Sequence, residues 1–261
     1  MYVKDVMDVK NPTIFTDDLA TKARALIREY ALRILPVINE NRKLAGIVSR
    51  GDVMIISSSV SPMRVKGIMS DAKCTPSMDD EVDPVVRQML KVDAWWAPVV
   101  SSPKDKTYRG VFGLEHFLEA IIKTSPERLS KSVSEFMSKK IMTCSPDDEV
   151  EQVWRLMQQR SLAGLPVTER GKLVGIVSQR DLIESSEAFP EFESKKGRFR
   201  ESPKIASVMK TNLVAVAPSV KAIRIAKAMV QKNMGRVPIK DTDGKLIGIV
   251  DREDIVRLLI K

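Results

Sequence analysis

The sequence is poor in the residues that build metal centres and many catalytic sites. Its 261 residues include a single histidine, His116, and two cysteines, Cys74 and Cys144. One histidine argues against a histidine-based metal site or a Ser-His-Asp triad, and the two cysteines lack metal-binding spacing. We therefore expect both cysteines to be small, reduced core residues. The sequence also has no glycine-rich phosphate loop and no nucleophile with a base at a recognisable spacing, so an enzyme is the least favoured class.

Long hydrophobic runs are absent as well. No apolar run approaches the roughly 20 residues that a membrane-spanning helix needs, and the start of the chain shows no signal-peptide pattern. Apolar residues make up 43% of the chain and charged residues 30%, which is typical of a globular protein and not of a disordered one. The sequence predicts a cytoplasmic protein that makes no membrane contact.

What the sequence does contain is internal repetition. A seven-residue phrase runs from a glycine to an acid in three copies, and a weaker fourth copy ends in histidine: Gly46–Asp52, Gly175–Asp181, Gly248–Asp254 and Gly110–His116. Ahead of each copy lies a short apolar segment around a proline, and further ahead a methionine opens the unit: Pro36, Pro98, Pro166 and Pro238, and Met7, Met69, Met137 and Met209. A repeat at intervals of about 64–73 residues defines the building block of the fold.

Each unit is predicted to read strand, helix, strand, strand, helix. In the first unit Leu19, Ala23 and Ile27 recur at helical spacing behind an aspartate pair, and two β-rich runs joined by turn residues follow. The second helix of each unit then starts near the acid of the phrase. The predicted fold class is α/β (α+β), with units at residues 1–60, 61–126, 127–190 and 205–261 and a charged linker at 191–204.

In this combination and order, the repeated motifs resemble those of cystathionine-β-synthase (CBS) domains. Such domains pair into a two-domain Bateman module, and four of them commonly form a flat disc of two modules. The layout is similar to the γ subunit of AMP-activated protein kinase and to stand-alone archaeal proteins of that type. The resemblance implies a regulatory protein that binds AMP, ADP or ATP (in some members S-adenosylmethionine) and has no reaction of its own. It implies an effector protein acting in trans, and a homodimer is one expected assembly.

The chemistry of the phrase supports this implication. A carboxylate in the first turn of a helix can accept hydrogen bonds from both ribose hydroxyls. A serine three residues earlier offers a hydroxyl to phosphate near the helix N-terminus, where backbone N–H groups favour an anion. The alternative is that Asp52, Asp181 and Asp254 only cap their helices, each stabilising the fold by about 1 kcal/mol.

In the family the partner repeat lends the base pocket, so the resemblance assigns residues to sites. The most complete site would combine repeats 3 and 4, with Arg236 aimed at phosphate: Ser178, Asp181, Val214, Met234, Gly235 and Arg236. A second would combine repeats 1 and 2: Ser49, Asp52 and Thr75, with Trp95 or Trp96. A tryptophan there would either stack on adenine or be buried in the module interface.

The remaining two sites depart from the pattern. Asp254 would be completed by Thr143, Leu162 and Ala163, but Asp251 replaces the hydroxyl residue of the family. A carboxylate facing a phosphate is repulsive, so this site should favour adenosine-like or cationic ligands, or need a neighbouring arginine. The fourth site has His116 and Gly113 in place of the acid and the hydroxyl residue, and we predict that it holds no ribonucleotide. The resemblance places Arg33 where the family has a phosphate-binding arginine, near the disc centre.

The positive charge of the chain suggests a second hypothesis. The formal net charge is +9, and the excess lies in residues 1–66 and 205–261. If the two modules meet head to head, these segments become neighbours and form one basic half-disc that could bind RNA or the ribosome. The charged linker could add phosphate contacts and a stacking ring: Lys195, Lys196, Arg198, Phe199 and Arg200. The alternative is that the basic surface serves only solubility.

Overall fold

The computed structural model describes residues 1–54, 56, 61–185 and 203–260. Repeat 1 contains β1 (Ile14–Phe15), α1 (Ala20–Glu29), β2 (Ile34–Ile38), β3 (Leu44–Ser49) and α2 (Arg50–Val53). Repeat 2 contains α3 (Val82–Lys91), β4 (Trp96–Val100), β5 (Tyr108–Gly113) and α4 (Leu114–Thr124). Repeat 3 contains α5 (Val150–Gln159), β6 (Gly164–Glu169), β7 (Lys172–Ser178) and α6 (Gln179–Glu184). Repeat 4 contains α7 (Ile205–Val208), α8 (Ala222–Gln231), β8 (Arg236–Lys240), β9 (Leu246–Asp251) and α9 (Arg252–Leu259).

The order of elements confirms the predicted repeat, with one difference. The first strand of the unit is regular only in repeat 1, where β1 pairs in parallel with β2. In the other repeats it is reduced to single parallel bridges, at Ser77, Cys144 and Val216. Prolines account for this shortening, because Pro76 directly precedes the first bridge residue, Pro146 and Pro218 follow the other two, and none has an N–H to donate to a ladder. Each central hairpin is antiparallel, as predicted.

The opening methionine and the glycine of the phrase recur together, because the opening segment of each repeat packs on the hairpin of its partner repeat. Met209 lies over Gly175, where an added methyl group would come 2.7 Å from its sulfur. Asp8, which follows Met7, pairs in both directions with Val111, and a methyl group at Gly110 would lie 2.6 Å from the Asp8 carbonyl oxygen. Glycine is therefore needed where the partner segment approaches the hairpin. The exchange joins repeat 1 to repeat 2 and repeat 3 to repeat 4, which gives the two modules.

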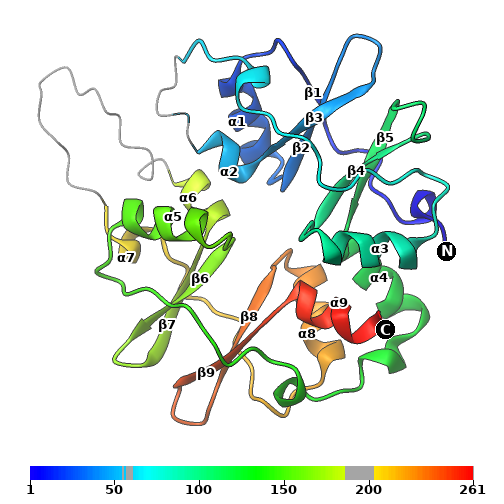
Figure 1. Ribbon diagram of the computed structural model, residues 1–261. Helices are drawn as coiled ribbons and strands as arrows, with labels where there is room; N and C mark the ends of the chain where they lie inside the picture. Colours follow the sequence, from blue (N-terminus) through cyan, green and yellow to red (C-terminus); the bar gives the residue numbers. More distant parts are fainter. Residues whose placement is uncertain (55, 57–60, 186–202, 261) are drawn as a thin grey trace, which may run out of the picture.

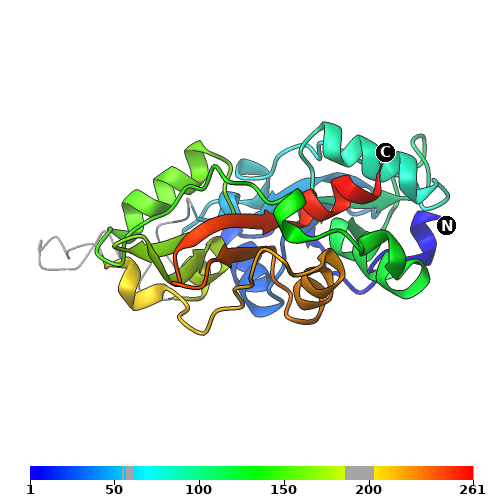
Figure 2. The same ribbon diagram turned by 90° about the horizontal axis from the view of Figure 1, so that it is seen from below.

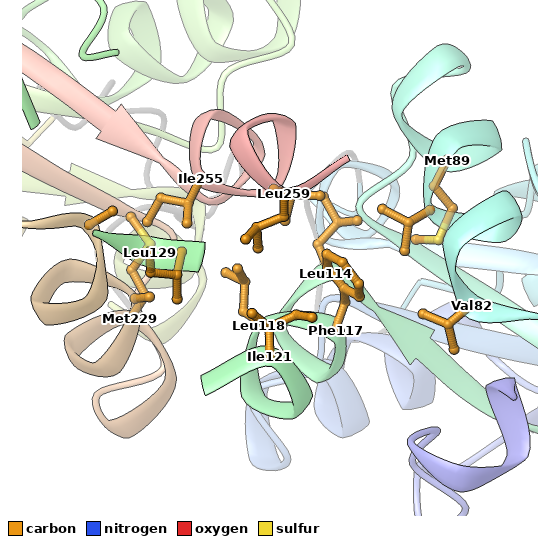
Figure 3. Close-up of a cluster of buried hydrophobic side chains, with 14 of the residues drawn as sticks. Val82, Met89, Leu114, Phe117, Leu118, Ile121, Leu129, Met229, Ile255 and Leu259 are labelled. Carbon is orange, nitrogen blue, oxygen red and sulfur yellow. The ribbon is translucent and has the colours of Figure 1, made fainter. Parts of the chain in front are cut away.

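The two modules form a flat disc with the four repeats around its centre (Figures 1 and 2). Helix α4 of repeat 2 packs against α8 and α9 of repeat 4, while α1 and α2 of repeat 1 pack against α6 of repeat 3. The larger of these contacts belongs to one apolar cluster, which holds the fully buried Phe117 and Leu118 of α4 together with Met229, Ile255 and Leu259 of repeat 4 (Figure 3).

The prediction that the first and last repeats form one basic half-disc is wrong. Repeat 1 lies beside repeats 2 and 3, and repeat 4 lies beside the same two, so the two most basic repeats face each other diagonally across the centre. They do not form one basic half-disc, because the helices that join the modules pair 1 with 3 and 2 with 4. The charged linker with Lys195, Lys196, Arg198, Phe199 and Arg200 lies outside the described residues, and its role in RNA binding stays a prediction.

Both cysteines are free, Cys144 buried and Cys74 partly buried. Burial raises the pKa of the Cys144 thiol to about 12, as expected for a core residue that stays a thiol at neutral pH. No helix in the described part of the chain is long and apolar enough to cross a membrane.

Candidate functional site

A cavity of about 370 Å³ opens between repeats 3 and 4; we call it cavity A. All six residues that the sequence assigned to the most complete site line this one cavity: Ser178, Asp181, Val214, Met234, Gly235 and Arg236. The first two end β7 and begin α6, and the others come from the loop before α8, the loop after it and the first residue of β8. Arg33, Trp95 and Trp96 of the other module also line cavity A.

The two carboxylate oxygens of Asp181 have different partners. Its Oδ2 accepts hydrogen bonds from the Ser178 backbone N, at 2.8 Å, and from the Ser178 hydroxyl. This is the capping arrangement that begins α6. Its Oδ1 instead forms an ion pair with Lys210 Nζ at 2.6 Å. The two sequence-based alternatives for this acid are therefore compatible, because one oxygen caps the helix while the other faces the cavity residue Lys210.

Cavity A is strongly cationic. Against the single acid Asp181, its lining holds five basic side chains: Arg33, Arg180, Lys210, Lys232 and Arg236. Burial, followed by the charge of Arg252, lowers the pKa of Arg33 to about 10. Burial also lowers the pKa of Arg236, although the charges of Asp251 and Asp254 act in the opposite direction. An anionic ligand would therefore find partly desolvated cations that lack full compensation within the protein.

Arg33 is the cation that reaches cavity A from the other module. Its Nη2 donates to the backbone oxygen of Asn233, at 3.1 Å, and to the side-chain oxygen of the same residue. Its Nε is buried and has no hydrogen-bond partner among the described atoms. The structure thus places Arg33 near the disc centre, as expected, with a donor still unused.

The two tryptophans lie in the module interface. The guanidinium carbon of Arg33 lies over the ring of Trp96, 5.2 Å from its centroid, and that of Arg236 lies over the ring of Trp95 at 5.5 Å. The Trp95 Nε1 donates to Glu253 Oε2 at 3.1 Å, across the boundary between repeats 2 and 4. Both rings are half-buried and line cavities A and B, with a guanidinium group near each ring, so the choice between adenine stacking and burial in the interface stays a prediction.

A second cavity of about 440 Å³, cavity B, shares Arg33, Trp95, Trp96, Ala163 and Arg236 with cavity A. Ser49 and Leu162 line it, but four other predicted residues line neither cavity: Asp52, Thr75, Thr143 and Asp254. Asp52 accepts hydrogen bonds from the backbone N and hydroxyl of Ser49, both at 2.7 Å, in the same capping arrangement as Asp181. The sequence-based sites of repeats 1 and 4 are therefore brought together only in part.

In repeat 2, the rings of His116 and Trp96 lie against the fourth copy of the phrase. His116 Nδ1 accepts from the backbone N of Gly113 at 3.1 Å, so the ring caps α4 in place of an acid. A methyl group at Gly113 would lie 2.5 Å from Cδ1 of Trp96, which shows how tightly that ring covers the phrase. These contacts support the expectation that this site holds no ribonucleotide, which stays a prediction.

Two acids face each other at the start of α9. The Asp254 backbone N donates to Asp251 Oδ1 at 3.0 Å, and the Asp251 backbone N donates to Asp254 Oδ2 at 2.9 Å. Burial, and then the charge of Asp251, raise the pKa of Asp254 to about 6. Burial also raises the pKa of Asp251, which lines cavity B. Asp251, the acid in place of the hydroxyl residue, therefore destabilises the folded state when both carboxylates are charged.

We expect Asp254→Asn to stabilise the protein at neutral pH. The folded-state pKa of Asp254, near 6, lies above its ordinary value of 3.8. The charged carboxylate therefore destabilises the folded state fully above pH 6, and this destabilisation disappears as the carboxylate is protonated towards pH 4. After allowance for solvent screening, removing the charge should raise stability by about 1–2 kcal/mol and Tm by about 2–5 °C at pH 7.5. Thermal melts at pH 7.5 and 5 measure the gain, which should shrink at the lower pH. Asp52→Asn is the matched control, since Asp52 faces a serine; an equal gain in both variants would contradict the account.

Sequence reasoning missed several residues at the centre. Arg50 donates to the carbonyl oxygens of Ala31 and Leu32 in the turn after α1. Arg252 is 1% exposed and pairs with Glu115 at 3.4 Å. Lys210 was missed too, although one signal was available: it follows the opening Met209, where the other repeats have Asp8, Ser70 and Ser138.

Comparisons with known proteins agree with this architecture. The CBS domain model matches residues 3–59, 133–188 and 205–261. The uncharacterized protein MJ1225 of Methanocaldococcus jannaschii is 21% identical over 276 aligned residues, which cover 98% of this chain and 97% of that protein. A CBS domain-containing protein of Dictyostelium discoideum is 33% identical over 132 residues, which cover 49% of this chain and 91% of that protein.

Two solved structures resemble the whole chain. The crystal structure of MJ1225, described as a proposed archaeal homolog of g-AMPK, has a TM-score of 0.87 at 21% identity and covers 99% of this chain and 100% of that one. An uncharacterized conserved protein from Pyrococcus horikoshii has a TM-score of 0.69 at 20% identity, with both chains fully covered. Such identities show a shared fold. Together with the three matched segments, they show that the chain belongs to the CBS domain family.

Proposed function

We propose that this protein is a non-catalytic sensor that binds an adenine nucleotide (AMP, ADP or ATP) in cavity A and signals its occupancy to a partner protein in trans. The observation that carries the proposal is the convergence of Asp181, Ser178 and five cations on one cavity between repeats 3 and 4. A volume of about 370 Å³ also falls within the range of roughly 300–1,000 Å³ that small-molecule sites occupy.

Each part of a nucleotide has a complementary surface in cavity A. The outward oxygen of Asp181 can accept hydrogen bonds from ribose hydroxyls, which are charge-assisted and therefore strong. The basic side chains can neutralise phosphate, with Arg236 and Arg33 already partly desolvated. The apolar lining can take a purine ring: Ile176, Leu213, Val214, Met234 and Pro238.

Regulation would follow from the position of cavity A at the boundary of the modules. Arg33, Trp95 and Trp96 belong to the first module, and the remaining lining belongs to the second. A ligand that contacts both modules has different affinities for arrangements in which the modules lie closer together or further apart. It can therefore shift the population of such arrangements in proportion to that difference in affinity. A partner that recognises one arrangement would read the occupancy of the cavity.

Calorimetric titration of the full chain with AMP, ADP and ATP tests the proposal. We expect saturable binding of at least one of them, with an affinity that falls as salt is raised because the cavity cations are screened. Failure of all three nucleotides to bind at millimolar concentration would refute it.

A further inference from the structure

The ion pair between Lys210 and Asp181 suggests how cavity A selects its ligand. The Lys210 Nζ lies 2.6 Å from Oδ1 of Asp181, whereas Oδ2 of the same carboxylate is held by Ser178. Asp181 is 7% exposed. The oxygen that ribose would need is therefore already occupied by an ammonium group, and a sugar can bind there only by displacing it.

The backbone of Lys210 is fixed by hydrogen bonds, while its side chain is largely exposed. Its N–H donates to the Ile176 carbonyl oxygen at 2.8 Å, and its carbonyl oxygen accepts from the Ile176 N–H at 3.0 Å. The side chain is 56% exposed, and a second acid, Glu184, lies 4.0 Å from Nζ. A long side chain anchored in this way can exchange one partner for another within the same cavity.

Of the four opening segments, that of repeat 4 has a lysine after the methionine, and the other three have aspartate or serine. The equivalent residue of each opening segment also crosses to its partner repeat, where Ser70 pairs with Ile47, Ser138 with Ile249 and Asp8 with Val111. Within the described residues, Asp181 is the only phrase acid that faces a lysine from the crossing segment. The arrangement is therefore specific to cavity A and is not a requirement of the fold.

We propose that Lys210 determines specificity in cavity A, holding Asp181 when the cavity is empty and moving to phosphate when a nucleotide binds. The inference rests on the proposed function of the cavity. A nucleoside without phosphate must break the ion pair and leave the ammonium beside four other cations, with the more distant Glu184, 4.0 Å from Nζ, as its remaining acidic neighbour among the described residues. A nucleotide offers the displaced ammonium an anion, so the cavity should strongly prefer AMP to adenosine.

The test compares AMP with adenosine by calorimetry in the wild type and in Lys210→Met. Losing one charge-assisted contact should weaken AMP about tenfold. Adenosine should bind about three- to tenfold more tightly, because no ion pair has to be broken. The two affinities thus move in opposite directions, which damage to the cavity would not produce. Lys204→Met is the control: it removes a surface charge paired with Glu149 at 3.8 Å outside cavity A, and should change neither affinity.

Lys210→Arg keeps the charge and should retain the preference for AMP, and circular dichroism checks that each variant is folded. Equal changes for both ligands in Lys210→Met, or no change, or no detectable adenosine binding by this variant, would overturn the inference while leaving nucleotide binding intact. If AMP, ADP and ATP all fail to bind the wild type, the proposed function itself is wrong.

Discussion

Replacing Asp181 by alanine is expected to lower the affinity for the bound adenine nucleotide by at least about a hundredfold. The variant loses the carboxylate oxygen available to the ribose hydroxyls, and hydrogen bonds to a charged group each stabilise a complex by about 1.5–3 kcal/mol. It also frees the Lys210 ammonium from its partner 2.6 Å away, which offsets a small part of this loss because no ion pair then has to be broken. Calorimetric titration of wild type and variant with the same nucleotide measures the loss.

Asp52→Ala is the matched control, because Asp52 and Asp181 make the same capping contacts with Ser49 and Ser178. Each substitution should reduce stability by about 1 kcal/mol through loss of the cap. Only Asp181 lines cavity A, so only its substitution should remove binding. Equal nucleotide affinity in the two variants would show that the acid of the phrase serves the helix alone.

Phe117→Ala is expected to destabilise the protein by about 3–5 kcal/mol, the usual cost of removing a large ring from a packed core. Phe117 is fully buried in α4, within the cluster that repeats 2 and 4 share (Figure 3). The cavity left behind would lie against α4, the helix that packs on α8 and α9 of repeat 4, so the contact between the modules should loosen. Because Arg33, Trp95 and Trp96 reach cavity A from the first module, nucleotide affinity should fall as well.

Chemical denaturation monitored by tryptophan fluorescence measures this loss. Phe117→Leu keeps most of the apolar volume and should recover all but about 1.5 kcal/mol. A loss below 1 kcal/mol in Phe117→Ala would contradict a core shared between the modules.

The repeat pattern allowed much of the fold and six of the residues that line cavity A to be predicted. The glycines and the opening methionines recur because one packs on the other across each module, so sequence periodicity reported a real contact. The six predicted residues of cavity A lie together for a related reason. The phrase fixes where α6 begins, and the hairpin of the partner repeat fixes where Met234, Gly235 and Arg236 enter the same cleft.

The contacts between modules could not be predicted in this way. The choice of 1 beside 3 and 2 beside 4 depends on the apolar faces of α4, α8 and α9, which the pattern within one repeat does not specify. The surroundings of Trp95 and Trp96 depend on three arginines from repeats 1 and 4. Lys210 acts on an acid of another repeat, so its contact appears only when the chain is folded.

A crystal structure of the full chain with AMP would test the central claim most directly. The account predicts density for the purine against Val214 and Met234, ribose hydroxyls within hydrogen-bond distance of Asp181, and the Lys210 ammonium turned from that carboxylate to the phosphate. AMP bound elsewhere while cavity A keeps its Lys210–Asp181 ion pair would contradict it.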